Sequence, residues 1–213
     1  MSRFAQLAYT PAVRDVQRAM GSGPAGERRL REPGAVPEPL TEAETGFVRS
    51  LDSFLIASVG ETGWPYVQHR GGPAGFVHVL DPHTLAFLDV RGNRQYITSG
   101  NLRGEERVAL FFLDHARCVR LKILGRASAG PVAERPELAA RLAEPRTDGV
   151  VEQLVSIRVE AFDWNCPKHL TPRFTETQLA EALAPVRRRI RLLEQENAEL
   201  RARLEPGHAT EGA

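Results

Sequence analysis

Two short segments rich in arginine, glycine and amide side chains stand at either end of one predicted hairpin. Residues 70–73 read Arg-Gly-Gly-Pro and precede the apolar run 76–80, and residues 91–95 read Arg-Gly-Asn-Arg-Gln and follow the run 84–89. Guanidinium groups offer paired donors to phosphate oxygens, and glycine lets the main chain approach a ligand closely. This composition suits a bound phosphate or a flat polar heterocycle, and it equally suits two plain polar loops that end a hairpin.

Two further pairs of side chains are candidates for contact with such a ligand. Arg120 and Lys122 are two positions apart on a predicted strand and therefore share one face, which is either a second cationic surface or an ordinary solvated one. Trp164 and Asn165 follow the last predicted strand. They form either a ring-stacking and hydrogen-bonding pair or an anchor for the C-terminal segment, and residue types alone leave both alternatives open.

The elements that position these side chains follow from short apolar runs separated by turn residues. Strands are expected at 54–59, 66–69, 76–80, 84–89, 107–113, 119–127 and 150–161. Helices are expected from Pro11 to about Gly21, from the capping box at Thr41 to about Leu51, at 97–103 and at 136–143. Residues 21–39 are expected to form an arm or a loop. So many short strands favour an antiparallel barrel or sandwich.

Composition limits the classes of protein to consider. The chain has 213 residues, of which 42% are hydrophobic, so one domain with a core and some appendages is expected. A formal net charge of +1 gives no strong field toward nucleic acid or a membrane. Two cysteines, Cys118 and Cys166, fit a reducing compartment, and the N-terminus has no apolar stretch long enough for a signal peptide or a membrane span. A cytoplasmic protein is therefore expected.

The C-terminal segment carries a heptad pattern. Its a positions are Leu183, Ile190, Asn197 and Leu204, and its d positions are Val186, Leu193 and Leu200. This seam predicts a parallel two-stranded coiled coil, with Pro185 at the start of a separate helix; an amphipathic helix packed on the same chain's barrel is the alternative. The expected domains are residues 1–40 (helix and arm), 41–175 (barrel), 176–205 (helix) and 206–213 (disordered tail).

Four stretches carry a resemblance to a known family. PYVQHRGGPAGF, FLDVRGNRQYITSGNL, RVALFFLDHARCVRLKILGRA and FDWNCPKHLTPRFT resemble the pyridoxamine 5'-phosphate oxidase-like family of FMN-binding split-barrel proteins, and more closely its flavin-nucleotide-binding branch. The resemblance covers roughly residues 41–175. It implies an α+β, mainly β fold, an antiparallel split β-barrel, with FMN as cofactor and a homodimer whose cofactor sites lie at the subunit interface.

The resemblance also implies which residues bind the cofactor. Arg94 and Lys122 are the implied phosphate ligands, with help from Ser99 or Asn101. Further residues implied to contact the flavin are Gln68, His69, Arg70 and Gly71 beside the ring, Val90, Asn93, Gln95 and Arg120, and Trp164 and Asn165 near the flavin of the partner subunit.

The function implied is that of a flavin-dependent oxidoreductase with an unknown small-molecule substrate or nicotinamide donor. The oxidase proper has an Arg-x-x-x-Leu-Lys pattern before its hairpin and a basic C-terminal segment for pyridoxal phosphate. This chain has Gln-His-Arg-Gly-Gly-Pro and Trp-Asn-Cys-Pro at the corresponding places. Flavin binding therefore carries over and the vitamin B6 substrate does not. No residue stands out as a general acid or base; His69 is the best candidate, and a structural role suits it better.

Parts of the sequence also fit three other functions. A haem or metal site would use His69, His115, Cys166 or His169, although the sequence has no second pair of ligands at zinc spacing. A DNA-binding zipper lacks the long basic region that should precede the heptads. A flavin carrier or sensor without catalysis has the same sequence features as an oxidoreductase.

Overall fold

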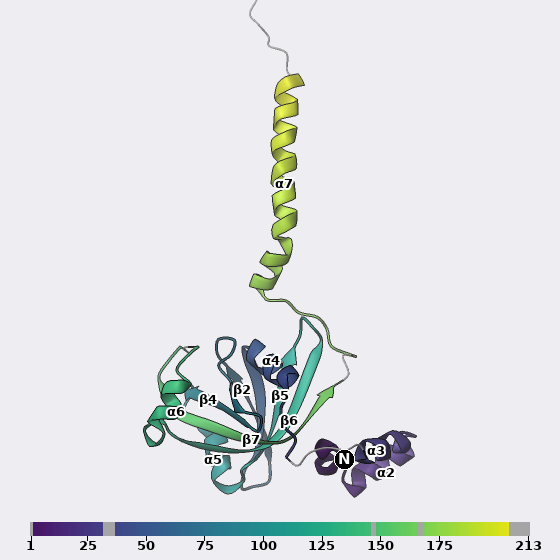
Figure 1. Cartoon of the computed structure of the whole chain (residues 1–213), viewed down its shortest axis with the longest axis vertical. Coiled ribbons are helices and arrows are strands. Elements are labelled where there is room, and N and C mark those ends of the chain that lie inside the picture. Colours follow the sequence, from purple (N-terminus) through teal and green to yellow (C-terminus); the bar gives the residue numbers. More distant parts are fainter. Residues whose placement is uncertain (1, 32–36, 146–147, 166–167, 205–213) are drawn as a thin grey trace, which may run out of the picture. The chain divides into compact units, whose positions relative to one another are not determined.

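The computed structural model describes residues 2–31, 37–145, 148–165 and 168–204 and divides the chain into two compact units. The first unit ends at Leu170 and contains a sheet with short helices, and the second begins at Thr171 and contains one long helix (Figure 1). The finer domain limits expected from the sequence stay predictions.

One antiparallel sheet of seven strands, in the order β2-β1-β5-β6-β7-β4-β3, forms the first unit's centre. The strands are β1 (Ser53–Val59), β2 (Pro65–Gly71), β3 (His78–Asp81), β4 (Thr84–Val90), β5 (Arg107–Asp114), β6 (Val119–Pro131) and β7 (Val151–Asn165). All the expected strands are present, and β6 and β7 extend further than expected. Because β2 and β3 are the two edges of the sheet, the barrel is split between them, which confirms the predicted fold class.

The inner face of the sheet builds an apolar core. Its aromatic rings are in direct contact: the ring centroid of Phe54 lies 4.9 Å from that of Phe112 and 5.5 Å from that of Phe87. Ile56 and Leu110 are buried beside them. Strand β1 buries every second residue, which is the period that a sheet with one covered face imposes. This packing fixes the register that brings the polar strand ends together.

The expected helices of the barrel are confirmed. They are α4 (Glu42–Ser50), α5 (Ile97–Gly104) and α6 (Pro136–Arg141), with a short 3₁₀ turn at Val132–Glu134. Helix α4 begins at the predicted capping box: the Thr41 hydroxyl accepts from the Ala43 amide, and the Glu44 carboxylate accepts from the Thr41 amide at 2.8 Å. Phe47 and Val48 bury the inner side of this helix against the core.

Three helices precede the barrel: α1 (Arg3–Ala8), α2 (Pro11–Ala19) and α3 (Gly23–Arg31). The expectation of helix α2 is confirmed, whereas the expectation of an arm or loop is wrong for Gly23–Arg31. Glycine and proline concealed this helix, since both are poor helix formers. The glycines serve close packing instead: a Cβ on Gly26 would lie only 2.4 Å from Oε1 of Gln17 on α2.

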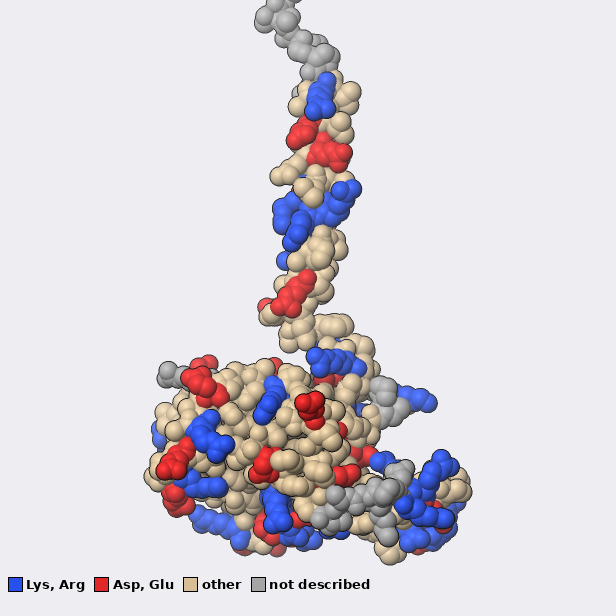
Figure 2. Space-filling model, viewed as in Figure 1, with Lys and Arg blue, Asp and Glu red and all other residues tan. Residues whose placement is uncertain are grey.

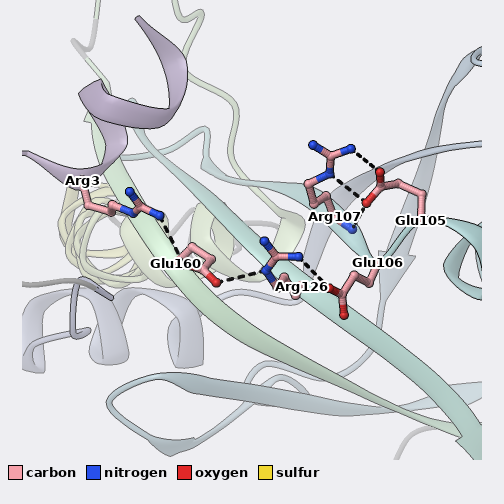
Figure 3. A network of polar contacts seen from close by, with 6 residues as sticks. All are labelled: Arg3, Glu105, Glu106, Arg107, Arg126 and Glu160. Carbon is pink, nitrogen blue, oxygen red and sulfur yellow. Dashed lines mark hydrogen bonds and ion pairs between the residues drawn. The ribbon is translucent and has the colours of Figure 1, made fainter.

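An ionic network fastens α1 to the sheet (Figure 3). Arg3 lies 3.9 Å from the Glu160 carboxylate on β7. Glu160 also accepts from Nε of Arg126 on β6 at 3.2 Å, and Nη1 of Arg126 donates to Glu106 at 2.6 Å. Helix α1 therefore packs against β7, and α3 and α2 follow it within the first unit.

An ion pair joins strands β2 and β4, which are not neighbours in the sheet. Nη1 of Arg70 donates to Oδ1 of Asp89 at 2.8 Å, and the two side chains are 19% and 15% exposed. Burial raises the pKa of the Asp89 carboxyl, and Arg70 opposes that rise. The pair is thus partly desolvated and links the two sides of the split.

The second unit consists of helix α7 (Glu176–Leu204). The expectation that a separate helix starts at Pro185 is wrong, because α7 is continuous and Pro185 lies inside it. No residue of α7 is buried, over the described length of this helix. Among the described residues, no helix combines the length and apolar composition needed to cross a membrane.

The Arg70–Asp89 pair predicts a non-additive effect on stability. Arg70→Met leaves the Asp89 carboxylate half-buried without its cation, and we expect a loss of about 2 to 3 kcal/mol in the free energy of unfolding. Arg70→Met combined with Asp89→Leu should recover more than half of that loss in urea unfolding. Additive losses in the double variant would show that the pair does not connect the strands.

Candidate functional site

The loop between β4 and α5 has a strained backbone. Arg94 and Tyr96 both lie in the left-handed region, with φ of 60° and 51°. For residues with a Cβ this conformation costs about 1 kcal/mol or more each, and such strain concentrates at binding sites. Asn93 sets the turn, because its Oδ1 accepts from the Gln95 amide at 3.2 Å. Three predicted ligands, Asn93, Arg94 and Gln95, thus share one loop of defined shape.

Helix α5 starts directly after this loop with an open N-terminus. Tyr96 occupies the N-cap position, and no side-chain hydrogen bond caps the first turn in the described structure. The amides of such a turn carry partial positive charge and bind anions. Thr98 Oγ1 is buried and makes no hydrogen bond within the described residues, and Ser99 Oγ donates to Oε1 of Gln153 at 2.6 Å. Amides and hydroxyls are therefore gathered at one helix end.

A charged network surrounds this helix end. Nε of Arg91 donates to Glu152 at 2.6 Å, the Tyr96 hydroxyl donates to Glu152 at 2.9 Å, and Nε of Arg94 donates to the Tyr96 hydroxyl at 3.1 Å. The hydrogen bond from Arg91, followed by that from Tyr96, lowers the pKa of Glu152. One ionised carboxylate therefore stands between two arginines, so a net positive charge remains for an anion.

An open pocket of about 560 Å³ lies beside α5. Its walls come from α5, the end of β6 and the start of β7: Tyr96, Ser99, Gly100, Arg103, Pro131, Glu152 and Gln153. Arg103 is one helical turn beyond Ser99 and adds a further cation on the same side. A pocket of this size with hydroxyl, amide and guanidinium groups suits the phosphate and sugar portion of a nucleotide.

Strand β2 divides the predicted ring-binding residues between two faces of the sheet. Gln68 and Arg70 are half-buried, whereas His69 and Gly71 are exposed on the opposite side. The His69 ring packs so close to Gly71 that a Cβ there would lie 3.1 Å from Cε1 of the imidazole. What these four residues have in common is the backbone of an edge strand, which offers amide and carbonyl groups to a ligand.

Of these four residues, Arg70 is linked to the pocket wall through its ion pair with Asp89, although Arg70 does not itself line the pocket. Its partner Asp89 lies opposite Gln153 in the β4–β7 register, and Gln153 lines the pocket. Nε of Arg70 is buried and makes no hydrogen bond within the described residues. Val90 follows Asp89 and enters the strained loop. The structure therefore brings Arg70 and Val90 to the same end of the sheet as Arg94.

Asn101, a predicted phosphate ligand, lies elsewhere. Its Nδ2 donates to Oγ of the buried Ser58 on β1 at 3.0 Å. A Cβ on Gly60 would lie 3.1 Å from Oδ1 of Asn101, so the contact is close on both sides. Asn101 thus docks α5 onto β1, and Ser99 is better placed for an anion.

The remaining predicted ligands, Arg120, Lys122, Trp164 and Asn165, lie at the far end of the β6–β7 ladder. Lys122 is nine residues from Pro131 on β6, and Pro131 borders the pocket. At about 3.3 Å per residue this separation is up to about 30 Å along the strand. Within one chain, these four residues therefore lie away from the pocket and from Arg94, which donates to the pocket residue Tyr96.

The N-terminal helices contact this far end. Nζ of Lys122 pairs with Asp163 at 2.9 Å and lies 4.9 Å from the centroid of the Phe4 ring on α1. Arg29 of α3 pairs with the same carboxylate at 2.5 Å. Lys122 is therefore part of a network that also holds α1 and α3.

Trp164 is attached to α4. Its Nε1 donates to Glu44 at 2.6 Å, and its ring packs edge-on against Phe47 with centroids 4.9 Å apart. Burial alone would raise the pKa of Glu44, but hydrogen bonds from Thr41 and Trp164 outweigh it and lower the pKa. These contacts fit the anchor alternative, while 37% of Trp164 stays exposed and its contact with a partner's flavin stays a prediction. Asn165 lies opposite Arg120 in the β6–β7 register.

A second pocket, of about 240 Å³, is a weaker candidate. It lies beside the network of Figure 3 and includes Arg3, Arg107 and Arg126 in its lining. Each of these arginines already has a carboxylate partner, and the hydrogen bonds from Arg107 hold the pKa of Glu105 at about 2. Because the charges of these arginines are already neutralised by carboxylates, the residues around this second pocket suit a structural role better than ligand binding.

The alternative of a metal site finds no support in the part of the chain that the structure describes, where no three His, Cys, Asp or Glu side chains are grouped to hold an ion. His69 lies on β2, His115 follows β5 and His169 follows β7. Cys166 lies outside the described residues.

Sequence reasoning missed five residues of the pocket region: Arg91, Tyr96, Arg103, Glu152 and Gln153. Tyr96 and Arg103 are close in sequence to the predicted loop, so their helical spacing from Ser99 was a usable signal. Glu152 and Gln153 carry no such signal. Only the β4–β7 and β6–β7 registers bring the start of β7 beside α5.

Comparison with known proteins agrees with this architecture. The family model described as Pyridoxamine 5'-phosphate oxidase matches residues 40–162. None of the curated proteins matches the chain.

Three solved structures illustrate the likeness. HupZ from Group A Streptococcus is 17% identical, with 63% of this chain and 99% of that one covered and a TM-score of 0.49. A conserved hypothetical protein from Mycobacterium tuberculosis is 18% identical, with 68% and 96% covered and a TM-score of 0.46. A Clostridium acetobutylicum protein related to general stress protein 26, of the pyridoxinephosphate oxidase family, is 15% identical, with 63% and 93% covered and a TM-score of 0.43.

The Trp164–Glu44 hydrogen bond predicts a measurable stability term. Trp164→Phe keeps an aromatic ring beside Phe47 but removes the donor, and we expect a loss of about 1 to 2 kcal/mol at neutral pH. Because the pKa of Glu44 is lowered in the folded state, its contribution to stability is complete above about pH 4.5, and the loss caused by Trp164→Phe should shrink as the pH falls below 4.5 through the lowered pKa.

The control is Trp64→Phe, since Trp64 is 78% exposed and its substitution should change the free energy of unfolding by less than about 0.5 kcal/mol. Equal effects of the two substitutions in thermal and urea unfolding would contradict an anchoring role for Trp164.

Proposed function

This chain belongs to the pyridoxamine 5'-phosphate oxidase family, and from that membership we propose that it is an FMN-binding flavoprotein that acts as an oxidoreductase on a small molecule other than a B6 vitamer. The observation that carries the proposal is the strained loop at Arg94 and Tyr96, followed by the open N-terminus of α5 beside a pocket of about 560 Å³.

The phosphate end of FMN fits this pocket. The first-turn amides of α5 and the Ser99 hydroxyl supply uncharged donors, and Arg94 supplies a guanidinium that is exposed and held by one hydrogen bond to Tyr96. The Thr98 hydroxyl and Nε of Arg70 are buried and make no hydrogen bond among the described residues, but neither residue lines the pocket, so we do not assign them to the phosphate. Glu152 and Gln153 offer acceptors to the ribityl hydroxyls.

The ring end of FMN requires groups that the same chain does not bring to the pocket. The backbone of β2 is one source of donors and acceptors, and a second chain is the source of Arg120 and Lys122. Because nine residues of strand β6, up to about 30 Å, separate Lys122 from the pocket border at Pro131 within one chain, we infer that the predicted ligand set acts on one flavin only if two subunits share the site. This supports a homodimer with two composite sites.

An apolar outer face of the sheet supports that dimer. Leu55, Val59 and Val67 on β1 and β2 are 38%, 38% and 58% exposed. Phe111 on β5 lies opposite Leu55 on one side and Lys122 on the other. A contiguous apolar patch of this kind marks an interface. Pairing two copies through it places Lys122 at the edge of the contact.

Bound FMN would supply hydride transfer, and the residues of the chain would bind, orient and shield the reacting groups. A flavin carrier or sensor is the alternative within the same site, and haem is the alternative cofactor. An absorption spectrum of the purified protein distinguishes flavin from haem. Anaerobic mixing with NADH, NADPH and a panel of small reductants then tests turnover: reduction of the bound flavin supports an oxidoreductase, and its absence supports a carrier or sensor.

FMN affinity tests the phosphate site. We expect binding in the micromolar range or tighter, which corresponds to about 8 kcal/mol or more. Arg94→Ala should weaken binding about ten- to a hundredfold, the size of one charge-assisted hydrogen bond, as measured by calorimetry. Arg14→Ala, an exposed arginine of α2, is the control and should leave the affinity unchanged. Equal affinities of the Arg94 and Arg14 variants would remove Arg94 from the site.

Heterodimers test whether the site is shared. Arg94→Ala and Lys122→Met should each weaken both sites of their homodimers. In a heterodimer purified with two different tags, one site then carries both substitutions and the other carries neither. We expect half of its sites to bind FMN with the affinity of the unsubstituted protein. A heterodimer in which no site regains that affinity would assign both residues to the same subunit.

A further inference from the structure

Helix α7 exposes an apolar seam along its length. The seam occupies heptad positions a and d: Leu179, Leu183, Val186, Ile190, Leu193, Asn197, Leu200 and Leu204. Leu193 is 43% exposed and Leu204 is 79% exposed, and the other large apolar side chains of the seam beyond Leu183 lie between these values. An isolated helix of 29 residues in water does not hold such a stripe open, because helix stability in proteins comes from packing of the apolar face.

Continuity through Pro185 lengthens this seam. With Leu183 at a, Pro185 falls at c, on the side of the helix away from the seam. Its missing amide and its ring therefore disturb only the outer surface. The seam begins at Leu179, one turn and a half before the proline, and comprises eight successive core positions up to Leu204.

We propose that α7 pairs with α7 of a second copy of this chain as a parallel two-stranded coiled coil. Ile190 at a with Leu193 and Leu200 at d is the combination that favours two strands. Asn197 at a is the polar residue that fixes register, since the two amides face each other across the axis.

Charge complementarity favours a copy of the same helix as the partner. Figure 2 shows blue and red bands alternating along α7. In the parallel pair, Arg189 at g faces Glu194 at e of the second copy, and Glu196 at g faces Arg201 at e. Antiparallel pairing over the full seam also attracts, with Arg189 beside Glu196 and Arg187 beside Glu194. The charges thus select a second copy of α7, and another feature selects its direction.

Asn197 selects the direction. In the antiparallel pair with the longest overlap, a positions face d positions, and Asn197 lies against Val186 of the second copy. Its amide would then be buried without a partner, which is unfavourable. In the parallel pair each Asn197 amide has the other as partner. The parallel arrangement is therefore the one in which every seam residue is satisfied.

Disulfide trapping in the full chain tests direction. Cys118 and Cys166 are first replaced by serine, and Leu200→Cys is introduced. Parallel helices place the two new thiols face to face, so mild oxidation should give a covalent dimer on nonreducing gels. Antiparallel helices place position 200 against 183, about 25 Å from its own copy at 1.5 Å per residue. The control is Ala202→Cys at f, which faces outward and should form far less dimer.

Two outcomes of disulfide trapping would overturn the proposal. A Leu200→Cys chain that stays monomeric, or one that links only when Leu183→Cys is also present, excludes the parallel pair. Spin labels at Ala202→Cys give an independent measurement: a short distance between the two labels supports the parallel pair, and a separation of about 30 Å or more contradicts it.

The role of Asn197 is tested on the same background. Asn197→Leu should raise the melting temperature of the helical signal and lower the yield of the Leu200→Cys disulfide, because antiparallel pairs become accessible. Gln195→Leu, at the outward f position, is the matched control and should change neither. A lower melting temperature for Asn197→Leu, or an effect equal to the control, would show that Asn197 does not lie in a helix pair.

Discussion

The length of the β6–β7 ladder is the constraint on which the rest of the first unit depends. Backbone hydrogen bonds fix the separation of its two ends, and side-chain motion cannot shorten it. Arg94, Ser99 and the open end of α5 lie beside the start of β7. Arg120, Lys122 and Trp164 lie at the other end of the ladder, where β6 starts and β7 ends. A ligand that needs both sets therefore needs two chains, and the apolar outer face of β1 and β5 gives those chains a surface to share.

The sequence was informative wherever the signal was local. Short apolar runs between turn residues located every strand, the capping box located α4, and the spacing of Leu183, Ile190 and Leu200 located the apolar seam of α7. It was misleading where a tertiary contact overrides a propensity. Gly23–Arg31 is helical despite its glycines and proline, and Gly26 there lies against the Gln17 side chain of α2; Pro185 is accommodated inside the continuous helix α7.

For the candidate site too, the sequence predicted the local part and not the part that depends on distant strands. The loop with Asn93, Arg94 and Gln95 is local, and its glycine and arginine content was visible. The contribution of Glu152 and Gln153 depends on strand register over a separation of more than fifty residues, for which the residue types give no sign. The placement of Gln68 and His69 on opposite faces follows from period-two alternation, so it could have been derived from the sequence once β2 was assigned.

The two proposed interfaces, each with two-fold symmetry, impose a condition on each other. If the barrel dimer and the α7 pair form between the same two copies, their two-fold axes coincide and the assembly closes as a dimer. If they form between different copies, each copy binds two others and the assembly grows into an open polymer. A parallel α7 pair has its axis along the seam, so both helices start at the same end, and the short connection after Leu170 then has to meet that axis from both barrels. An antiparallel pair would separate the two starts by about 40 Å, the length of the helix at 1.5 Å per residue. Closure of a single dimer is thus easier with the arrangement that Asn197 favours, and helix pairing then raises the effective concentration at which the two composite flavin sites form.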